Sequence, residues 1–323
     1  MSLGIFLRAA VLACSVLPVA AHAQPYPVKP VRMIVTCPPG CSPDILGRAI
    51  GQPVSQVFGQ PVVVENRAGA NGNIGMDACA KAAPDGYTLC MSSNVTMSLN
   101  PFAYEKLPFE PQQMVPIIHL GNLDQAIAVH ASLPARDIRE LVELARAKPG
   151  GVAWASLGNG STSHLYLEWF SAKTGAKFLH VPYKGSPEAI RALAAAEVMV
   201  TTLTPRSLGP LIASNRVRVL AVVSGSKRSP LLPEVPSLAE QGYELDFRNW
   251  FALFFPKDTG AEPVQRWNTE VNKLLAERSF TEKYFASAAM TPTGGTPADL
   301  AAIARASRKV GAELVNIAKL KFE

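Results

Sequence analysis

Short apolar runs rich in β-branched residues alternate with longer amphipathic runs along most of the chain. Residues 31–36, 62–65 and 87–91 are typical of buried strands, whereas 44–58 and 74–83 have the apolar spacing of helices. Parallel strands need crossover connections, and helices usually supply them. We therefore predict an α/β fold in which doubly wound parallel sheets are covered by helices on both faces.

A second series of the same kind begins after Pro116. In chain order we expect strand 126–129, helix 138–147, strand 152–156, helix 161–174, strand 178–181, helix 187–196, strand 198–202 and strand 217–223. The C-terminal part has mainly helical spacing, at 264–276, 281–289 and 297–318. Two separate series predict two lobes, and the chain is long enough to bury a core in each.

The first 23 residues have the pattern of a secretory signal peptide. Arg8 precedes an apolar stretch that ends at Ala20, and Ala21-His22-Ala23 is a small-residue cleavage site. We expect cleavage after Ala23 and export to the periplasm. The alternatives are an N-terminal helix of the folded domain and lipoprotein processing at Cys14. Cleavage leaves 300 of the 323 residues and lowers the formal net charge from +6 to +5.

Charge and motifs argue against several classes of function. The basic residues are spread along the chain, and the doublet Lys227-Arg228 has no interleaved aromatic residues, so we expect no nucleic-acid partner. The sequence contains no G-x-S-x-G, H-E-x-x-H or P-loop motif. The run from Gly69 to Gly75 reads G-x-x-G-x-x-G, which differs from the dinucleotide fingerprint, and we interpret it as a loop that needs positive φ.

Neither histidines nor cysteines form a recognisable metal or redox motif. No two of the four histidines that remain after cleavage have metal-binding spacing, so we expect no metal and no other cofactor: His119, His130, His164 and His180. Four cysteines also remain, and they allow three pairings: Cys37, Cys41, Cys79 and Cys90. A Cys37–Cys41 bridge and buried free thiols both stay open.

Two turns that precede expected helices offer backbone N–H groups. The segment 37–44 reads CPPGCSPD, in which Gly40 permits close approach of a ligand, and 158–164 reads GNGSTSH, with no acidic side chain. Helix N-termini bind anions through hydrogen bonds and the helix dipole. Each hydrogen bond to a charged acceptor contributes about 1.5–3 kcal/mol, so several approach the ~8 kcal/mol of micromolar affinity.

We therefore predict an anion site at these turns. Its expected residues are Pro39, Gly40, Cys41, Ser42, Asp44, Asn159, Gly160, Ser161, Thr162 and Ser163. The alternative is two ordinary capped helices, in which the carboxylate of Asp44 occupies its own helix start. Asn94 and Thr96 follow the strand 87–91, at the edge of an α/β sheet where ligands bind, and are expected to add uncharged contacts.

A similar triplet of residues occurs in each half of the chain. Ser42-Pro43-Asp44 and Ser186-Pro187-Glu188 each combine a serine at the expected N-cap, a proline at the first helical position and an acid in the first turn. Both triplets closely follow an expected strand. This similarity favours two similarly wound lobes.

Several long blocks, in order, resemble the solute receptors of tripartite tricarboxylate transporters, the Bug family. In the N-terminal part these are YPVKPVRMIVTCPPGCSPDILGRAI, GQPVVVENRAGANGNIG and AKAAPDGYTL; later come GNGSTSH, HVPYKGS, RVRVLAVVSGSKRSPLLPEVPSLAEQGY and WFALFFP. The resemblance implies a type II periplasmic binding protein, with two lobes that close about a hinge like a Venus flytrap. It places residues 24–123 and 247–323 in one lobe and 124–246 in the other.

The resemblance also implies how a ligand is held. Receptors of this family bind a carboxylate between loops of opposing lobes, which correspond here to 38–44 and 158–163. The chain departs from the family in that loop, where Cys41 replaces a glycine, Pro43 is added and Cys37 replaces an aromatic residue. Where the family has a run like D-L-M-F-D, this chain has VMVTT over residues 198–202, so Thr201 and Thr202 join the expected site. Loss of the acid disfavours an amino group on the ligand. Lys184 either reaches the cleft or is solvated.

The leading hypothesis is a monomeric extracytoplasmic receptor, not an enzyme. Its ligand would be a di- or tricarboxylate or related organic acid, passed to membrane transporter subunits or sensed by a signalling ectodomain. Gly160→Asp should abolish binding, because it adds a negative charge beside the site. The alternatives are an exported α/β enzyme with a cysteine activated at Cys37 or Cys41 and a structural surface protein.

Overall fold

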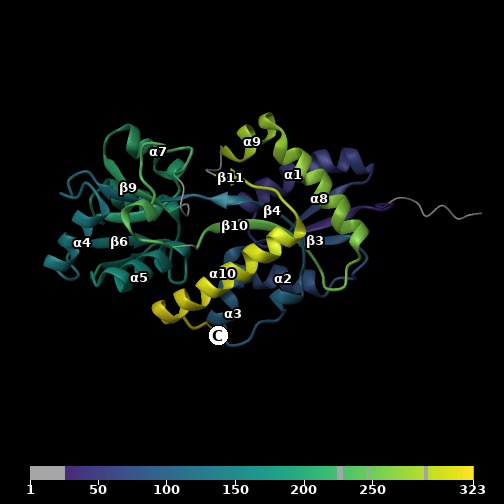
Figure 1. Cartoon of the computed structure of the whole chain (residues 1–323), viewed down its shortest axis with the longest axis horizontal. Helices are drawn as coiled ribbons and strands as arrows, with labels where there is room; N and C mark the ends of the chain where they lie inside the picture. The colour runs from purple at the N-terminus through teal and green to yellow at the C-terminus, as the bar shows by residue number, and fades with distance from the viewer. Residues whose placement is uncertain (1–25, 224–227, 246, 287–289, 323) are drawn as a thin grey trace, which may run out of the picture.

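Two mixed sheets, each covered by helices on both faces, make up the fold (Figure 1). The computed structural model describes residues 26–223, 228–245, 247–286 and 290–322. The predicted signal peptide and its cleavage site after Ala23 lie outside the described residues, as do the last three positions of the predicted helix 281–289. Among the described residues, none of the helices is long and apolar enough to cross a membrane.

The first sheet has six strands in the order β11-β4-β10-β3-β1-β2. The strands are β1 (Val31–Val35), β2 (Val62–Asn66), β3 (Thr88–Ser93), β4 (Val115–Leu123), β10 (Asn249–Phe255) and β11 (Met290–Pro292). Alternate residues of β1 face opposite layers. Met33 packs with α1 (Ser42–Phe58) and α8 (Ala261–Ala276), whereas Ile34 packs with α2 (Asn73–Ala80) and α10 (Pro297–Ala318).

The second sheet has five strands in the order β7-β6-β8-β5-β9. They are β5 (Gln125–His130), β6 (Ala153–Ser156), β7 (Leu179–Pro182), β8 (Val200–Leu203) and β9 (Val217–Val223). Trp154 of β6 faces α4 (Ile138–Ala147) and α5 (Thr162–Thr174). Its neighbour Ala155 faces α6 (Ser186–Ala194) and α7 (Pro205–Ala213) on the opposite side.

Both sheets are mixed, which corrects the expectation of parallel sheets within the predicted α/β fold. The strands β1, β2 and β3 are parallel, as are β6, β7 and β8, but β10 runs antiparallel to both β3 and β4. In the second sheet β5 runs antiparallel to both β8 and β9. The physical reason is the path of the chain: β4 leads out of the first sheet and β10 returns to it, so these two strands run in opposite directions.

The chain changes sheet twice, and α10 contacts both cores. It leaves the first sheet at Leu123, enters the second at Gln125 and returns to the first at Asn249. Near the start of α10, Leu300 packs with the first sheet, whereas Leu314 near its end packs in the second core. In Figure 1 this yellow helix runs along both parts of the molecule.

Most predicted helix and strand boundaries agree with the structure to within a few residues, with one correction in the two similar triplets. Ser42 and Ser186 are not N-caps: Cys41 and Gly185 hold those positions, and each serine is the first helical residue. The helix predicted at 281–289 is α9 (Arg278–Tyr284), which ends earlier. The apolar pattern of the sequence does not predict α7, β4, β10 or β11.

All four cysteines of the described chain are in disulfides. One bond joins Cys37 to Cys41, within the turn before α1, and the other joins Cys79 of α2 to Cys90 of β3. The open question between a bridge and free thiols is thereby answered in favour of the bridge. Cys37 and Cys41 therefore present no free thiol for catalysis.

Candidate functional site

A cavity of about 610 Å³ is lined by residues from both sheets and their helices. From the elements around the first sheet come Ser42, Ile45, Asn71, Val95, Leu123, Asn249 and Tyr284. From those around the second come Gln125, Leu157, Gly160, Ser161, Thr162, Ser163, Ser186, Leu203, Thr204, Arg206 and Ser207. Of the fourteen residues predicted for the site, Ser42, Gly160, Ser161, Thr162 and Ser163 are among these.

Four helices begin at the wall of this cavity, and each contributes polar lining residues. Ser42 lies at the start of α1, Ser161 at that of α5, Ser186 at that of α6 and Thr204 at that of α7. Three of these helices follow the parallel strands β6, β7 and β8, so they begin at the same carboxyl edge of the second sheet. Ligands of open α/β sheets bind at that edge.

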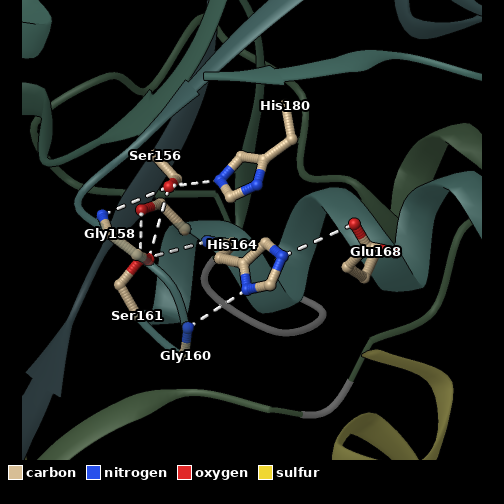
Figure 2. Close-up of polar contacts among 8 residues, drawn as sticks. Ser156, Gly158, Gly160, Ser161, His164, Glu168 and His180 are labelled. Atoms are coloured by element: carbon tan, nitrogen blue, oxygen red, sulfur yellow. Dashed lines mark hydrogen bonds and ion pairs between the residues drawn. The ribbon is translucent and has the colours of Figure 1, made fainter. Parts of the chain in front are cut away.

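The start of α5 is held in a fixed shape by its own polar groups (Figure 2). Ser161 is the N-cap, and its Oγ accepts a hydrogen bond from the N–H of His164 at 3.3 Å. The N–H of Gly160 donates to Nδ1 of His164 at 3.1 Å. Since these two donors are satisfied, the N–H groups of Thr162 and Ser163 are the ones in the first turn that lack an intrahelical acceptor.

Two stacked histidines, His164 and His180, support this turn. The rings of His164 and His180 lie with centroids 4.2 Å apart, and Nε2 of His180 is 2.6 Å from Oγ of Ser156 (Figure 2). Burial and the neighbouring His164 lower the pKa of His180. The hydrogen bond with His164 lowers the pKa of Glu168, whose Oε1 is 3.5 Å from Nε2 of His164. Analysing the histidines by spacing alone gave no indication of this pair, because it forms between α5 and β7.

The start of α1 is occupied by its own carboxylate, as the alternative interpretation of this turn proposed. Oδ2 of Asp44 accepts from the N–H of Gly40 at 2.8 Å, and Oδ1 accepts from Arg48 and Asn66. Burial on its own raises the pKa of Asp44, but these three hydrogen bonds bring it below the usual value. Pro39, Gly40, Cys41 and Asp44 do not line the cavity. Ser42 is the lining residue that this predicted loop supplies.

Four further predicted residues are buried and do not line the cavity. Asn94 accepts from the N–H of Trp250 at 3.3 Å, and Thr96 donates to the carbonyl of Asn71, a lining residue, at 2.8 Å. In β8, Thr201 donates to the carbonyl of Ala155, and Thr202 is fully buried. These side chains support the wall. Asn159 and Lys184 are exposed, and neither lines the cavity.

The start of α7 also lines the cavity, although none of its residues was predicted for the site. Thr204 is the N-cap, and its Oγ1 accepts from the N–H of Ser207 at 3.2 Å. Arg206, in the first turn, is exposed and is the only charged residue in the lining drawn from the described chain. The signal was present: Thr204-Pro205 is an N-cap residue followed by proline at the first helical position.

The lining favours an anion. It consists of hydroxyls, side-chain amides, helix N-termini and one guanidinium, together with apolar side chains, and within the described chain it includes no carboxylate. Donors of this kind bind carboxylates by direct hydrogen bonds and favourable electrostatics.

Fold and cavity together define a two-lobed periplasmic solute-binding protein. A TctC solute-binding protein from Polaromonas has a TM-score of 0.80 and 25% identity, with 90% of this chain and 99% of that one covered. Rpa4515 of R. palustris, solved with adipate, has a TM-score of 0.77 and 31% identity, with 92% and 99% covered.

The chain belongs to the family of tripartite tricarboxylate transporter receptors. The model of that family, described as "Tripartite tricarboxylate transporter family receptor", matches residues 46–317. BugT of Bordetella pertussis is 37% identical over 302 residues, which cover 91% of this chain and 89% of that protein. The resemblance seen in the sequence blocks is thereby confirmed, and with it the class of tripartite tricarboxylate transporter receptors.

Proposed function

We propose that the protein is an extracytoplasmic receptor that binds a small di- or tricarboxylate or related organic acid in the 610 Å³ cavity. The main support for this proposal is the lining of the cavity. Four helices begin there, and the lining contains hydroxyls, side-chain amides and one arginine but no carboxylate among the described residues. The adipate in the related Rpa4515 supports the same class of ligand. The role is that of a receptor and not an enzyme.

We further propose the mature form and the division of the chain. Cleavage after Ala23 releases a monomer whose lobes comprise 24–123 with 247–323, and 124–246. The lobes close around the ligand, and the closed form delivers it to transporter subunits or to a sensor ectodomain. Because α10 packs in both cores, this helix is an additional connection that closure has to accommodate.

In the proposed complex a ligand carboxylate accepts hydrogen bonds from the N–H groups of Thr162 and Ser163. The hydroxyls of Ser42 and Ser161 lie in the same lining. The other predicted residues, among them Gly40, Asp44, Asn94 and Thr201, act by shaping the wall and not by direct contact.

A screen of ligands followed by one backbone substitution tests the proposal. Thermal-shift measurements and calorimetry with dicarboxylates, tricarboxylates, aromatic acids and acidic amino acids should identify carboxylates that bind. Thr162→Pro should then weaken the best of them by about 10-fold or more, because it deletes one N–H donor to a charged acceptor. Proline is accepted at the first helical position, and the extended Ser161 that precedes it is compatible with proline.

Two controls make the result specific. Thr162→Ala removes the hydroxyl but keeps the N–H, and Ala261→Pro places proline at the first position of α8, outside the cavity lining. Both should bind nearly as well as the wild type if the N–H is what matters. No thermal shift with any acid would refute the receptor function, and unchanged affinity in Thr162→Pro would refute the assigned contact.

A further inference from the structure

Helices in this protein commonly neutralise their own positive N-terminal ends. Five of them carry an acid in the first turn: Asp44 in α1, Glu140 in α4, Glu188 in α6, Glu262 in α8 and Asp299 in α10. Two of the five begin at the cavity. The carboxylate of Asp44 accepts the N–H of Gly40, and that of Glu188 accepts the N–H of Lys184 at 3.1 Å. The starts of α1 and α6 are therefore already paired with anions of the chain.

The other two helices at the cavity, α5 and α7, have no acid in the first turn. The start of α5 keeps the N–H groups of Thr162 and Ser163 for a ligand. The start of α7 is more positive still, because its first turn contains a cation, Arg206, in addition to lacking an acid. A cation at the positive end of a helix is disfavoured, and within the described chain Arg206 has no ion pair to offset this. An anion bound beside it would remove the penalty.

These two helices follow neighbouring strands, and both begin at the lining of the cavity. The helix α5 follows β6 and α7 follows β8, and β6 and β8 are parallel neighbours with Ala155 opposite Thr201. From β6 the chain passes to β7 on one side, and from β8 it passes to β9 on the other, while α5 and α7 cover opposite faces. The strand order thus reverses between β6 and β8, which creates the crevice where α/β sheets bind ligands.

We propose that Arg206, at the start of α7, binds a second anionic group of the ligand whose first carboxylate is held at the start of α5. This inference rests on the proposed function and adds to it the residue that selects ligands with two anionic groups. Both anionic groups are held by the second sheet and its helices. The loop before α1 then faces the ligand mainly through Ser42, since Asp44 already occupies the donor of Gly40.

Matched acids with one and two carboxylates test the inference by calorimetry. The probes are succinate with butyrate, glutarate with pentanoate and adipate with hexanoate. We expect at least one dicarboxylate to bind the wild type 10-fold or more tightly than its monocarboxylate counterpart. Arg206→Gln should remove most of that preference, with a loss of at least 10-fold for the dicarboxylate and less than 2-fold for the monocarboxylate.

Two further variants separate charge from geometry and from general electrostatics. Arg206→Lys keeps the charge but loses the planar fork, so its preference for the dicarboxylate should be intermediate. Lys184→Gln removes an exposed charge of the same lobe that does not line the cavity, and it should leave both affinities unchanged. The melting temperature of Arg206→Gln should equal or exceed that of the wild type, since a disfavoured cation has been removed.

The outcomes distinguish this inference from the function on which it rests. If Arg206→Gln weakens both members of a pair equally, or neither, the assignment of the second anionic group is overturned while carboxylate binding stands. An effect of Lys184→Gln as large as that of Arg206→Gln would overturn it as well. If the wild type binds none of the six acids or any other carboxylate, the proposed function itself is refuted.

Discussion

The ring of Phe322 lies against Gly160, so that a Cβ on residue 160 would be 2.5 Å from Cζ of the ring. Phe322 is fixed by backbone hydrogen bonds to Ala103 and Glu105. Its ring also packs on Tyr104, whose hydroxyl accepts from Nδ2 of Asn71 at 3.1 Å. Because Asn71 and Gly160 both line the cavity, the C-terminal segment supports two parts of its wall from behind.

Gly160→Ala alone should weaken carboxylate binding by about 10-fold, because φ at this residue is +76° and the new methyl group meets Phe322. The left-handed conformation costs a non-glycine residue about 1–2 kcal/mol. Gly160→Asp should weaken binding further through its charge. Calorimetry on both variants measures the two contributions separately.

The control for Gly160→Ala is the same change combined with Phe322→Ala. The double variant relieves the contact with the ring and should recover part of the affinity, while the backbone strain remains. If Gly160→Ala binds like the wild type and only Gly160→Asp fails, charge alone explains the effect and the contact with Phe322 is irrelevant to binding.

His164→Leu should destabilise the protein by about 1–3 kcal/mol and weaken binding, because the N–H of Gly160 loses its acceptor Nδ1. His164→Asn is the matched variant, since its side-chain oxygen can take the place of Nδ1. Urea denaturation and calorimetry on the two variants check this. Equal losses in both would show that ring packing on His180, and not the hydrogen bond, is what matters.

Stability should fall as the pH decreases from about 6.5 toward 4, in part because of His119. This residue is 3% exposed, and burial, followed by the charge of Arg248, lowers its pKa from 6.5 to about 4. Between these pH values the histidine of the unfolded chain binds a proton that the folded protein does not bind. Lowering the pH therefore stabilises the unfolded state relative to the folded state. The effect of this one residue is at most about 3 kcal/mol.

Urea denaturation of the wild type and of His119→Gln at pH 7, 5.5 and 4.5 measures this contribution. The variant should lose less stability than the wild type over the same range. The comparison concerns the change in stability with pH. The stability of the variant at pH 7 is expected to differ from that of the wild type, because Nδ1 of His119 also lies 2.9 Å from Oγ1 of Thr293. Parallel pH profiles for the two proteins would exclude His119 as the titrating group.

Replacing both Cys79 and Cys90 by alanine should cost about 3 kcal/mol, the loop-closure term for a separation of 11 residues. Both cysteines are fully buried, so lost packing adds to this cost. The disulfide between Cys37 and Cys41 closes a shorter loop, with a separation of 4, so replacing these two cysteines by alanine should cost less. Denaturation curves of the two double variants give the comparison, and the reverse order would contradict it.

The alternation of apolar runs predicted most strands and helices, because burial of one helix face or of a whole strand leaves a periodic signal. The same signal carries no information about strand direction, which explains why the antiparallel pairing of β5 was not predicted. Strand β10 is buried almost throughout, so its apolar residues run together without alternation. The short helix α7 contains Gly209 and Pro210, and both weaken a helical pattern.

The predicted residues that line the cavity are those whose sequence signal is local. The turn at 158–163 was recognised because glycines and hydroxyls before a helix suffice to define a donor-rich N-terminus. Arg206 was missed because its helix was missed. The pairing of His164 with His180 depends on two neighbouring elements, and no spacing along the chain encodes it. The role of Asp44 was ambiguous from the sequence. A ligand-binding turn and a helix start occupied by the carboxylate of Asp44 have the same residues.

The position of Phe322 has a practical consequence for handling the protein. An affinity tag or reporter domain attached close to Phe322 would lie beside a ring that packs against the wall of the cavity. Immobilisation through this segment would therefore alter the affinity that it is meant to measure.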